Sequence, residues 1–412
     1  MAKPIFIATH PNFEKNDYRL LISLLFNFAE WKKEQNVSDF TKLVSTFFKS
    51  NAMATDSARS ALYILLINLD IPKGSEVILP AFSCMVIANA VKWAGLTPMF
   101  ADCNTQNFNY DLNDLTKKIT QKTKVILVQH TFGFPEDITA IRKIVGKDIF
   151  IIEDLAHSLG GRTDNKLLGT LGDATILTFG IEKVISSIRG GMLVIKDEVL
   201  AKKISQNIYI LPAFSKWKTL IALKGAVLWH MITPMYYWGI GKVTIGKMFV
   251  FLAHKLGIMG NMIEDCEYDT CKPKWLPSKM SPALAKLGMN QFKKLTRLNK
   301  HRAEIARLYF QELNINYQIA KDDFVTFLRF PVIVKEASSL ILEAKREKIV
   351  LGDWYRKILY APDKTLKLLG YKKGSCVNAE YLSQHIVNLP THINVNREDA
   401  LRICNIVKKY LI

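Results

Sequence analysis

Short apolar segments alternate with helical patterns between residues 57 and 195, and this alternation constrains the fold more than any other feature. Strands without interspersed polar residues are buried on both faces, and helices between them provide crossovers, so the pattern predicts an α/β domain with a mainly parallel sheet. The expected strands are 76–80, 97–101, 124–128, 148–152, 174–179 and 192–195, with helices at 86–93 and 136–145. Ligands bind at the carboxyl ends of such strands.

The pattern changes after Pro277. A long charged amphipathic helix is expected at 282–313, a strand at 327–334 and a closing helix at 397–410. We therefore predict a large domain over residues 1–275, with an N-terminal arm, and a smaller C-terminal α+β domain over residues 276–412. A chain of 412 residues is long enough for two or three domains with cores of their own.

Composition excludes several classes of protein. The six cysteines are scattered without a CxxC pair or a histidine at metal spacing, so neither a disulfide framework nor a metal site is predicted. The first residues lack the apolar core of a secretory signal, which favours a cytoplasmic location. The net charge is +19, but no nucleic-acid-binding module accompanies it, so nucleic acid is not expected as a partner.

Two predicted strands are followed by residues whose side chains could take part in catalysis. Asp154 follows one strand and could pair with a protonated ring nitrogen, and His157 could donate to an adjacent ring oxygen. Asp154 could equally cap the following helix. Lys183 follows the next strand, where desolvation lowers an amine pKa and frees the amine to attack a carbonyl. A lone lysine, however, is more often a solvated surface residue.

Three further features fall at strand or helix ends. Ser57, Ala58 and Arg59 open a helix whose free N–H groups suit an anion, although an ordinary N-cap would look the same. Thr178 offers a hydroxyl, and the glycine pair at 190–191 permits close backbone approach. His130 is either a ligand contact or a satisfied core histidine, and the second interpretation is slightly favoured.

The order and spacing of these features match one known arrangement. The segments IIEDLAHSLGG, LGDATILTFGIEKV and RGGMLVIKD, within residues 57–197, resemble the pyridoxal-phosphate (PLP) sugar aminotransferases of the DegT/DnrJ/StrS type. The resemblance continues in MSPALAKLGMNQFKKL and NLPTHINVNREDALRI, and it omits about 40 N-terminal residues and 207–263. It implies the aspartate-aminotransferase-like fold of PLP-dependent transferases.

The resemblance also implies site residues. Lys183 matches the family's Schiff-base lysine, and Asp154 matches the acid that pairs with the pyridinium nitrogen. His157 takes the position that contacts the ring hydroxyl. Thr178 stands where the family has a phosphate-binding serine, and Ala58 with Arg59 stands where it commonly has Gly-Thr at a phosphate-binding helix start.

Two positions depart from the family. Where an aromatic ring often stacks on the cofactor, the chain has Cys84 preceded by Ser83, so either the stacking is lost or a neighbour such as Phe82 supplies it. Glu182 replaces the usual Thr or Ser before the lysine, and this carboxylate could raise the lysine pKa or bind a substrate cation. Family members that act as sugar dehydratases replace the lysine, so Lys183 favours transamination.

The segment at about 207–263 is an apolar, basic insertion. No acidic residue lies between Glu198 and Glu264, whereas eight lysines do. A membrane span is not expected, because Lys224 offsets the apolar residues around it. Two alternatives remain open: helices lying on an anionic membrane surface, with Trp217, Trp229 and 236–238 at the interface, or a buried dimer interface or core insertion.

The function expected from the resemblance is conversion of a keto-sugar, nucleotide-linked or lipid-linked, to an amino-sugar with an amino acid donor, glutamate being favoured. Such enzymes act as homodimers, and this one is expected in the cytoplasm or peripherally at the inner face of the membrane. The alternatives are other PLP chemistry on an amphiphilic substrate, or a catalytically silent PLP-fold scaffold in a membrane-associated assembly.

Overall fold

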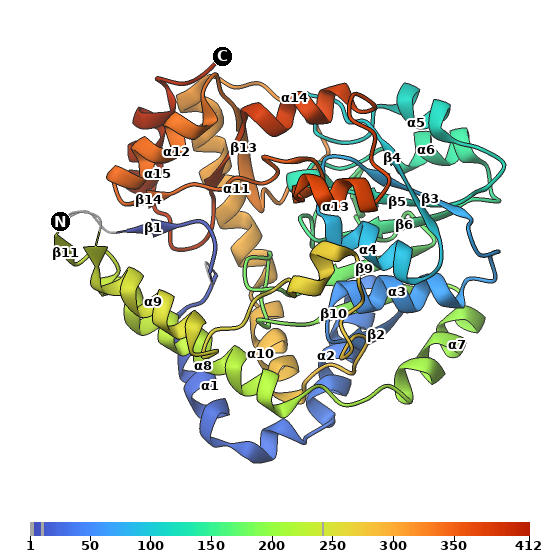
Figure 1. Cartoon of the computed structure of the whole chain (residues 1–412), viewed down its shortest axis with the longest axis horizontal. Helices are drawn as coiled ribbons and strands as arrows, with labels where there is room; N and C mark the ends of the chain where they lie inside the picture. Colours follow the sequence, from blue (N-terminus) through green and yellow to red (C-terminus); the bar gives the residue numbers. More distant parts are fainter. Residues whose placement is uncertain (1–3, 10–11, 241–242) are drawn as a thin grey trace.

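A single sheet lies at the centre of the large part of the molecule, as the computed structural model shows (Figure 1). The structure describes residues 4–9, 12–240 and 243–412, and within them seven strands pair in the order β2-β10-β9-β6-β5-β3-β4. These strands are β2 (Asn51–Thr55), β3 (Glu76–Pro80), β4 (Thr97–Ala101), β5 (Thr123–Gln129), β6 (Phe150–Asp154), β9 (Ala174–Thr178) and β10 (Gly191–Ile195). Strands β4, β3, β5, β6 and β9 are parallel, and β10 runs antiparallel to β9 and β2. The predicted mainly parallel sheet is confirmed.

Both faces of this sheet are buried, which explains the uninterrupted apolar strands. In β3, Val77 belongs to the core beneath α3 (Ala58–Asn68) and α4 (Met85–Trp93), whereas Ile78 belongs to the core beneath α5 (Leu112–Lys118) and α6 (Ile138–Val145). Strand β2 was not predicted. Its sequence, NAMAT, has little intrinsic strand preference and forms the edge by pairing with β10.

The predicted helix at 282–313 is wrong in one respect, because it is two helices, α10 (Pro282–Phe292) and α11 (Leu295–Leu313). Helix α10 packs closely on α2 (Gln35–Phe48), and a Cβ at Gly288 would lie 2.6 Å from the Phe40 ring. Helix α11 packs elsewhere, where the Tyr309 hydroxyl donates to the Pro390 carbonyl at 2.8 Å. The chain bends between the two helices to reach both partners.

The C-terminal part is built on two antiparallel strands, β13 (Arg329–Ile333) and β15 (Ile386–Pro390). Helices α11, α12 (Ala337–Arg346) and α15 (Arg397–Val407) contribute to the same core, and Figure 1 shows them together, away from the central sheet. Besides α1, α8 and α9, which are described below, the further helices and strands are β1 (Ile5–Phe6), β7 (Arg162–Thr163), β8 (Lys166–Leu167), β11 (Gly239–Ile240), β12 (Val243–Thr244), β14 (Ile349–Val350), α7 (Glu198–Tyr209), α13 (Asp363–Leu368) and α14 (Val377–His385).

The apolar, basic segment forms α8 (Lys216–Ile232) and α9 (Ile245–Lys255), which lie at the lower left of Figure 1. Helix α8 is a packed helix, because Leu223 and Ala226 share a core with Leu21 and Leu24 of α1 (Lys15–Phe26). Helix α9 is mostly exposed. Among the described residues, no helix combines the length and apolar character needed to cross a membrane.

Candidate active site

A cavity of about 180 Å³ opens where β5, β6 and β9 end, in agreement with the rule for parallel sheets. The strand ends contribute Gln129, Asp154 and Thr178 to its wall. Of the residues predicted from sequence, the cavity brings together Ser57, Ala58, Arg59, Cys84, Asp154, Thr178 and Lys183. It does not include His157 and Ser83 in its wall. The Ser83 hydroxyl is buried and donates to the Pro80 carbonyl at 2.7 Å.

Lys183 lies on a turn that distant parts of the chain hold in place. The Lys183 amide donates to the Gly180 carbonyl at 3.2 Å. The Asn12 side chain donates to the Lys183 carbonyl at 2.8 Å, and the buried Arg302 guanidinium donates to the Val184 carbonyl at 2.6 Å. The N-terminal arm and α11 therefore fix the backbone that presents the amine to the cavity.

The environment of Lys183 favours the uncharged amine. Burial lowers the pKa of Lys183, Glu182 opposes this change, and Arg329 adds to it. The carboxylate of Glu182 lies 3.0 Å from Arg329, so its charge is already paired. Glu182 raises the pKa of Lys183, as predicted, but the opposite effect of burial is larger. The net result is a lowered lysine pKa, which suits a nucleophile or base.

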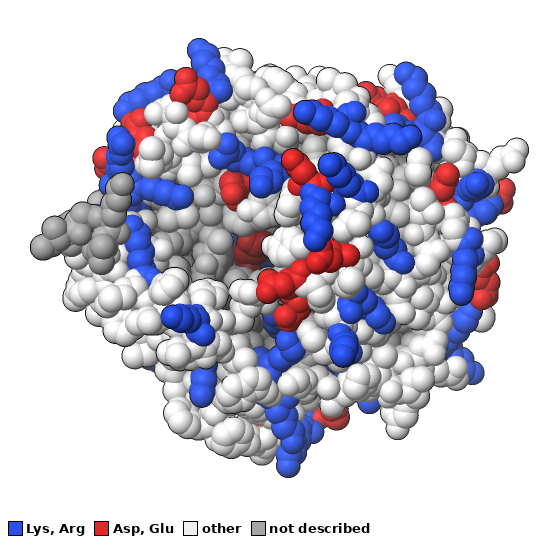
Figure 2. Space-filling view, in the orientation of Figure 1, with Lys and Arg blue, Asp and Glu red and all other residues white. Residues whose placement is uncertain are grey.

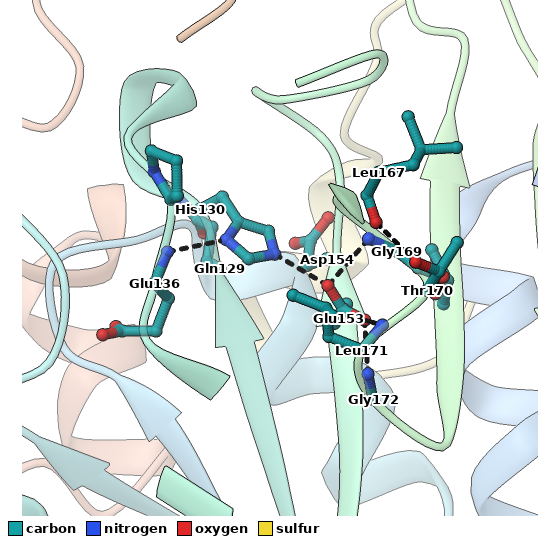
Figure 3. Close-up of polar contacts among 12 residues, drawn as sticks. Gln129, His130, Glu136, Glu153, Asp154, Leu167, Gly169, Thr170, Leu171 and Gly172 are labelled. Atoms are coloured by element: carbon teal, nitrogen blue, oxygen red, sulfur yellow. Dashed lines mark hydrogen bonds and ion pairs between the residues drawn. The ribbon is translucent and has the colours of Figure 1, made fainter. Parts of the chain in front are cut away.

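The two adjacent acids of β6 have different environments. Glu153 is fully buried and faces a turn, and Figure 3 shows its carboxylate ringed by donors. These donors are His130 Nε2 at 3.1 Å and the amides of Gly169 at 2.7 Å, Leu171 at 2.7 Å and Gly172 at 2.5 Å. Burial raises the pKa of Glu153, but these donors outweigh it and hold the pKa below its ordinary value. Glu153 therefore stabilises the fold.

Asp154 points to the other side of the strand, as alternation along a strand requires. It lines the cavity, and its Oδ1 accepts a hydrogen bond from the Ala156 amide at 2.8 Å. Burial raises the pKa of Asp154, while the Ala156 amide and Lys183 oppose that change. A buried carboxylate of this kind gains from a cationic partner in the cavity.

His130 is a satisfied core histidine, as the sequence slightly favoured. It is fully buried, and its Nδ1 accepts from the Glu136 amide at 2.9 Å. The opposite nitrogen must then carry the proton and donate to Glu153. Figure 3 shows this chain of contacts beside Asp154.

His157 lies behind the cavity wall. Its Nδ1 accepts from the Phe132 amide at 3.1 Å, and its Nε2 lies 3.1 Å from the Tyr355 hydroxyl. Burial keeps the pKa of His157 well below its ordinary value, with Lys183 and Arg329 adding to the effect. With Nδ1 accepting, Nε2 carries the proton and donates to Tyr355, which lines the cavity. His157 thus reaches the cavity through Tyr355.

Two helices begin at the cavity, which gives one part of it an affinity for anions. Helix α3 starts after Ser57, whose hydroxyl accepts from the Ser60 amide at 3.3 Å, and α4 starts after Cys84. Free N–H groups and the helix dipole at both starts favour a negative group. Gly191 makes this arrangement possible, because a Cβ there would lie 2.3 Å from backbone atoms of Ser57 and Ala58.

The arginine at the start of α3 is engaged by the protein itself. Arg59 forms a buried ion pair with Glu267 and donates to the Met262 carbonyl at 2.8 Å. Its role is therefore at least partly to fix the segment that supplies Met262 and Ile263 to the cavity wall. Arg189 also lines the cavity and lies 5.4 Å from the Trp275 ring centroid.

The surroundings of Cys84 show which aromatic side chain is available at the cavity. Phe82 is fully buried behind the wall, with its ring 5.5 Å from Tyr355, and it does not line the cavity. Tyr355 does line it. Burial raises the pKa of the Cys84 thiol, so this group is a neutral part of the wall.

Several residues at the site escaped sequence reasoning. Asn12 and Tyr355 have no local motif, and they reach the site from segments far apart in the chain. Arg189 opens the quoted segment RGGMLVIKD, but no role was predicted for it. Gln129 carried a usable signal, because it directly follows the predicted strand 124–128 and precedes His130. Its neighbour in the parallel register is Asp154.

The residues present fit a PLP group. A lysine with a lowered pKa, a buried carboxylate for a cationic ring nitrogen and two helix starts for a phosphate share one cavity. These features match the three parts of PLP: the lysine suits the aldehyde, the carboxylate suits the ring nitrogen and the helix starts suit the phosphate.

The fold and this site define the class of protein. The chain belongs to the DegT/DnrJ/EryC1/StrS aminotransferase family, whose model matches residues 21–215 and 276–408. The intervening residues 216–275, which include α8 and α9, lie outside the match.

Individual relatives cover nearly the whole chain. GDP-perosamine synthase from Escherichia coli O157:H7 is 24% identical over 369 residues, covering 87% of this chain and 85% of that protein. GDP-4-keto-6-deoxy-D-mannose 3-dehydratase from Yersinia pseudotuberculosis is 27% identical over 410 residues, covering 95% and 94%. A putative sugar aminotransferase from Streptococcus pneumoniae, solved in its PLP form, superposes with a TM-score of 0.73 at 18% identity, covering 98% of each chain.

Proposed function

We propose that this chain is a PLP-dependent aminotransferase that transfers an amino group from an amino acid, glutamate being favoured, to a keto-sugar carried by a nucleotide or a lipid. The observation that carries the proposal is the meeting of Lys183 and Asp154 in one cavity at which α3 and α4 begin. The family assignment and the sugar-modifying relatives support the substrate class.

The roles of the residues follow from their surroundings. PLP supplies an aldehyde for amine exchange and an electron-withdrawing ring. Lys183 would hold that group and, when released from it, would accept or deliver a proton at Nζ, whose pKa burial lowers. Asp154 keeps a proton on the ring nitrogen. Thr178 and the start of α3 bind the phosphate, while His157 orients the Tyr355 hydroxyl.

A half-reaction tests this function. Protein loaded with PLP and mixed with glutamate is expected to convert to the pyridoxamine form and release one 2-oxoglutarate per site, followed by absorbance and by assay of the oxo acid. Lys183→Ala is the matched control and should give neither signal. Absence of conversion in the unaltered protein would favour a catalytically silent scaffold, and release of a different product would indicate other PLP chemistry.

The homodimer expected from the family is also part of the proposal. Sedimentation equilibrium is expected to give twice the chain mass of 46.9 kDa. A monomer at working concentration with full activity would contradict it.

We further propose that α9 contacts the surface of an anionic membrane. Large apolar side chains on α9 and just after it are exposed, namely Met248 50%, Phe249 47%, Phe251 66%, Leu252 42% and Leu256 70%. Lys247 and Lys255 belong to the same helix, and Figure 2 shows scattered lysine and arginine and no acidic side chains over this region. Trp217 and Trp238 are exposed, whereas Trp229, expected at the interface, is buried against Phe6 and Tyr236. Apolar area and basic charge together favour binding at the headgroup level.

Vesicle pelleting tests this contact. The unaltered protein should pellet with vesicles containing phosphatidylserine, and a variant carrying Phe251→Asp and Leu256→Asp should stay in the supernatant. Leu342→Asp, at a residue 55% exposed on α12, is the matched control and should still pellet. If the α9 variant instead changes the oligomeric state without changing pelleting, the face is a subunit interface.

A further inference from the structure

Arg329, at the start of β13, is a buried guanidinium with unused donors. It is 1% exposed, and none of its three nitrogens makes a hydrogen bond with the described residues. Its Nη2 lies 3.0 Å from the Glu182 carboxylate, and its Cζ lies 3.2 Å from the centroid of the Trp354 ring. A guanidinium has five N–H donors, and leaving them unpaired in a buried site is costly. The site is therefore built to bind an additional acceptor.

Glu182 separates this guanidinium from the cavity. Its side chain is 25% exposed and lines the cavity, directly beside Lys183 in the sequence. Because the Glu182 carboxylate both pairs with Arg329 and lines the cavity, its displacement would leave the guanidinium facing the cavity.

The chemistry of the donor requires a cation at this place. An α-amino acid carries its carboxylate on the carbon that bears the reacting amine, so the carboxylate must lie close to Lys183. The two arginines that line the cavity are engaged elsewhere: Arg59 binds Glu267, and Arg189 donates to the Asn261 carbonyl. A planar guanidinium held against an aromatic ring suits two-point recognition of a carboxylate.

We propose that Arg329 binds the α-carboxylate of the amino donor and that Glu182 is its resident counter-ion, which the donor displaces. The inference rests on the proposed aminotransferase function and deepens it, because it identifies a residue pair that sets donor affinity. Glu182 competes with the donor for the same cation. Donor binding therefore depends on two opposing carboxylates at one guanidinium.

Binding of glutarate, which has two carboxylates and no amine, tests the pair separately from turnover. Titration calorimetry is carried out on the PLP-loaded protein and on Glu182→Gln, Arg329→Met and Arg329→Lys variants. Glu182→Gln should bind glutarate about tenfold more tightly, and Arg329→Met about tenfold or more weakly, since charged hydrogen bonds contribute roughly that much. Arg346→Met, at an exposed arginine on α12, should bind like the unaltered protein.

Kinetics supply the second readout. Arg329→Lys should raise the KM for the donor and leave the half-reaction with the keto acceptor unchanged, which a merely structural role would not produce. Unchanged or weaker glutarate binding by Glu182→Gln would overturn the proposal, even if Arg329→Met fails to fold. Arg329-dependent glutarate binding without transamination would uphold the subsite while contradicting the proposed function.

Discussion

Replacing Glu267 by alanine leaves the Arg59 guanidinium buried without its partner. Glu267 lies in the 3₁₀ turn Asp265–Asp269 and is fully buried, while the Arg59 side chain is 9% exposed. The same carboxylate accepts from the Glu264 amide at 2.8 Å. The change therefore removes an ion pair and a turn-stabilising hydrogen bond next to the cavity wall.

The expected cost is large because the remaining charge, on a side chain that is only 9% exposed, has little access to water. Removing one partner of a buried ion pair costs about 3 to 5 kcal/mol. Replacing both partners, as in the double variant Arg59→Met with Glu267→Ala, removes the unpaired charge and should cost less than Glu267→Ala alone. The Met262 carbonyl would then lose its donor, so some loss remains.

Equilibrium urea unfolding of the unaltered, single and double variants measures these differences as a thermodynamic cycle. We expect a loss of about 3 to 5 kcal/mol for Glu267→Ala and a partial recovery in the double variant. A loss below about 1 kcal/mol, the range of exposed pairs, would refute the reasoning. So would a double variant whose loss equals the sum of the two single losses.

Two further predictions concern other buried groups. Burial raises the pKa of Glu136 from its ordinary 4.5 to about 8, so the folded state keeps a proton that the unfolded chain releases, and stability falls as pH rises from 4.5 to 8. Glu136→Gln removes this loss of stability. The free energy of unfolding in urea should therefore exceed that of the unaltered protein by an amount that grows from pH 4.5 to 8 and vanishes below pH 4.5. A difference that does not change with pH would contradict the raised pKa of Glu136. Gly191→Ala should weaken PLP binding at least tenfold by displacing the start of α3. Gly225→Ala is the control and should not weaken it, because a Cβ there would meet no atom closer than 3.7 Å. Equal PLP affinities of the two variants would contradict the close approach of Gly191 to the start of α3.

Local sequence was sufficient for six of the seven strands of the described sheet, all except β2, and for the residues that follow the strands. Strands β3 and β4 match their predicted ranges, and Asp154, Thr178 and Lys183 meet because parallel strands present their carboxyl ends on one edge. The division of the chain at residue 275 and the roles of the site residues stay predictions.

The features that local sequence could not predict depend on packing between distant parts of the chain. The break between α10 and α11 has no proline or glycine at the bend and follows from two packing partners. Arg59 looked like a free phosphate contact because its partner, Glu267, is 208 residues away. Arg329 and Tyr355 join the lysine's surroundings only through the folded C-terminal part.

Mapping the site of cofactor attachment tests the central claim most directly. The protein is incubated with PLP, reduced with borohydride and digested with trypsin, and the peptides are analysed by mass spectrometry. We predict a pyridoxyl group on Lys183 at about one per chain, and none at that position after incubation without PLP. Attachment at a different lysine, or none at all, would contradict the account.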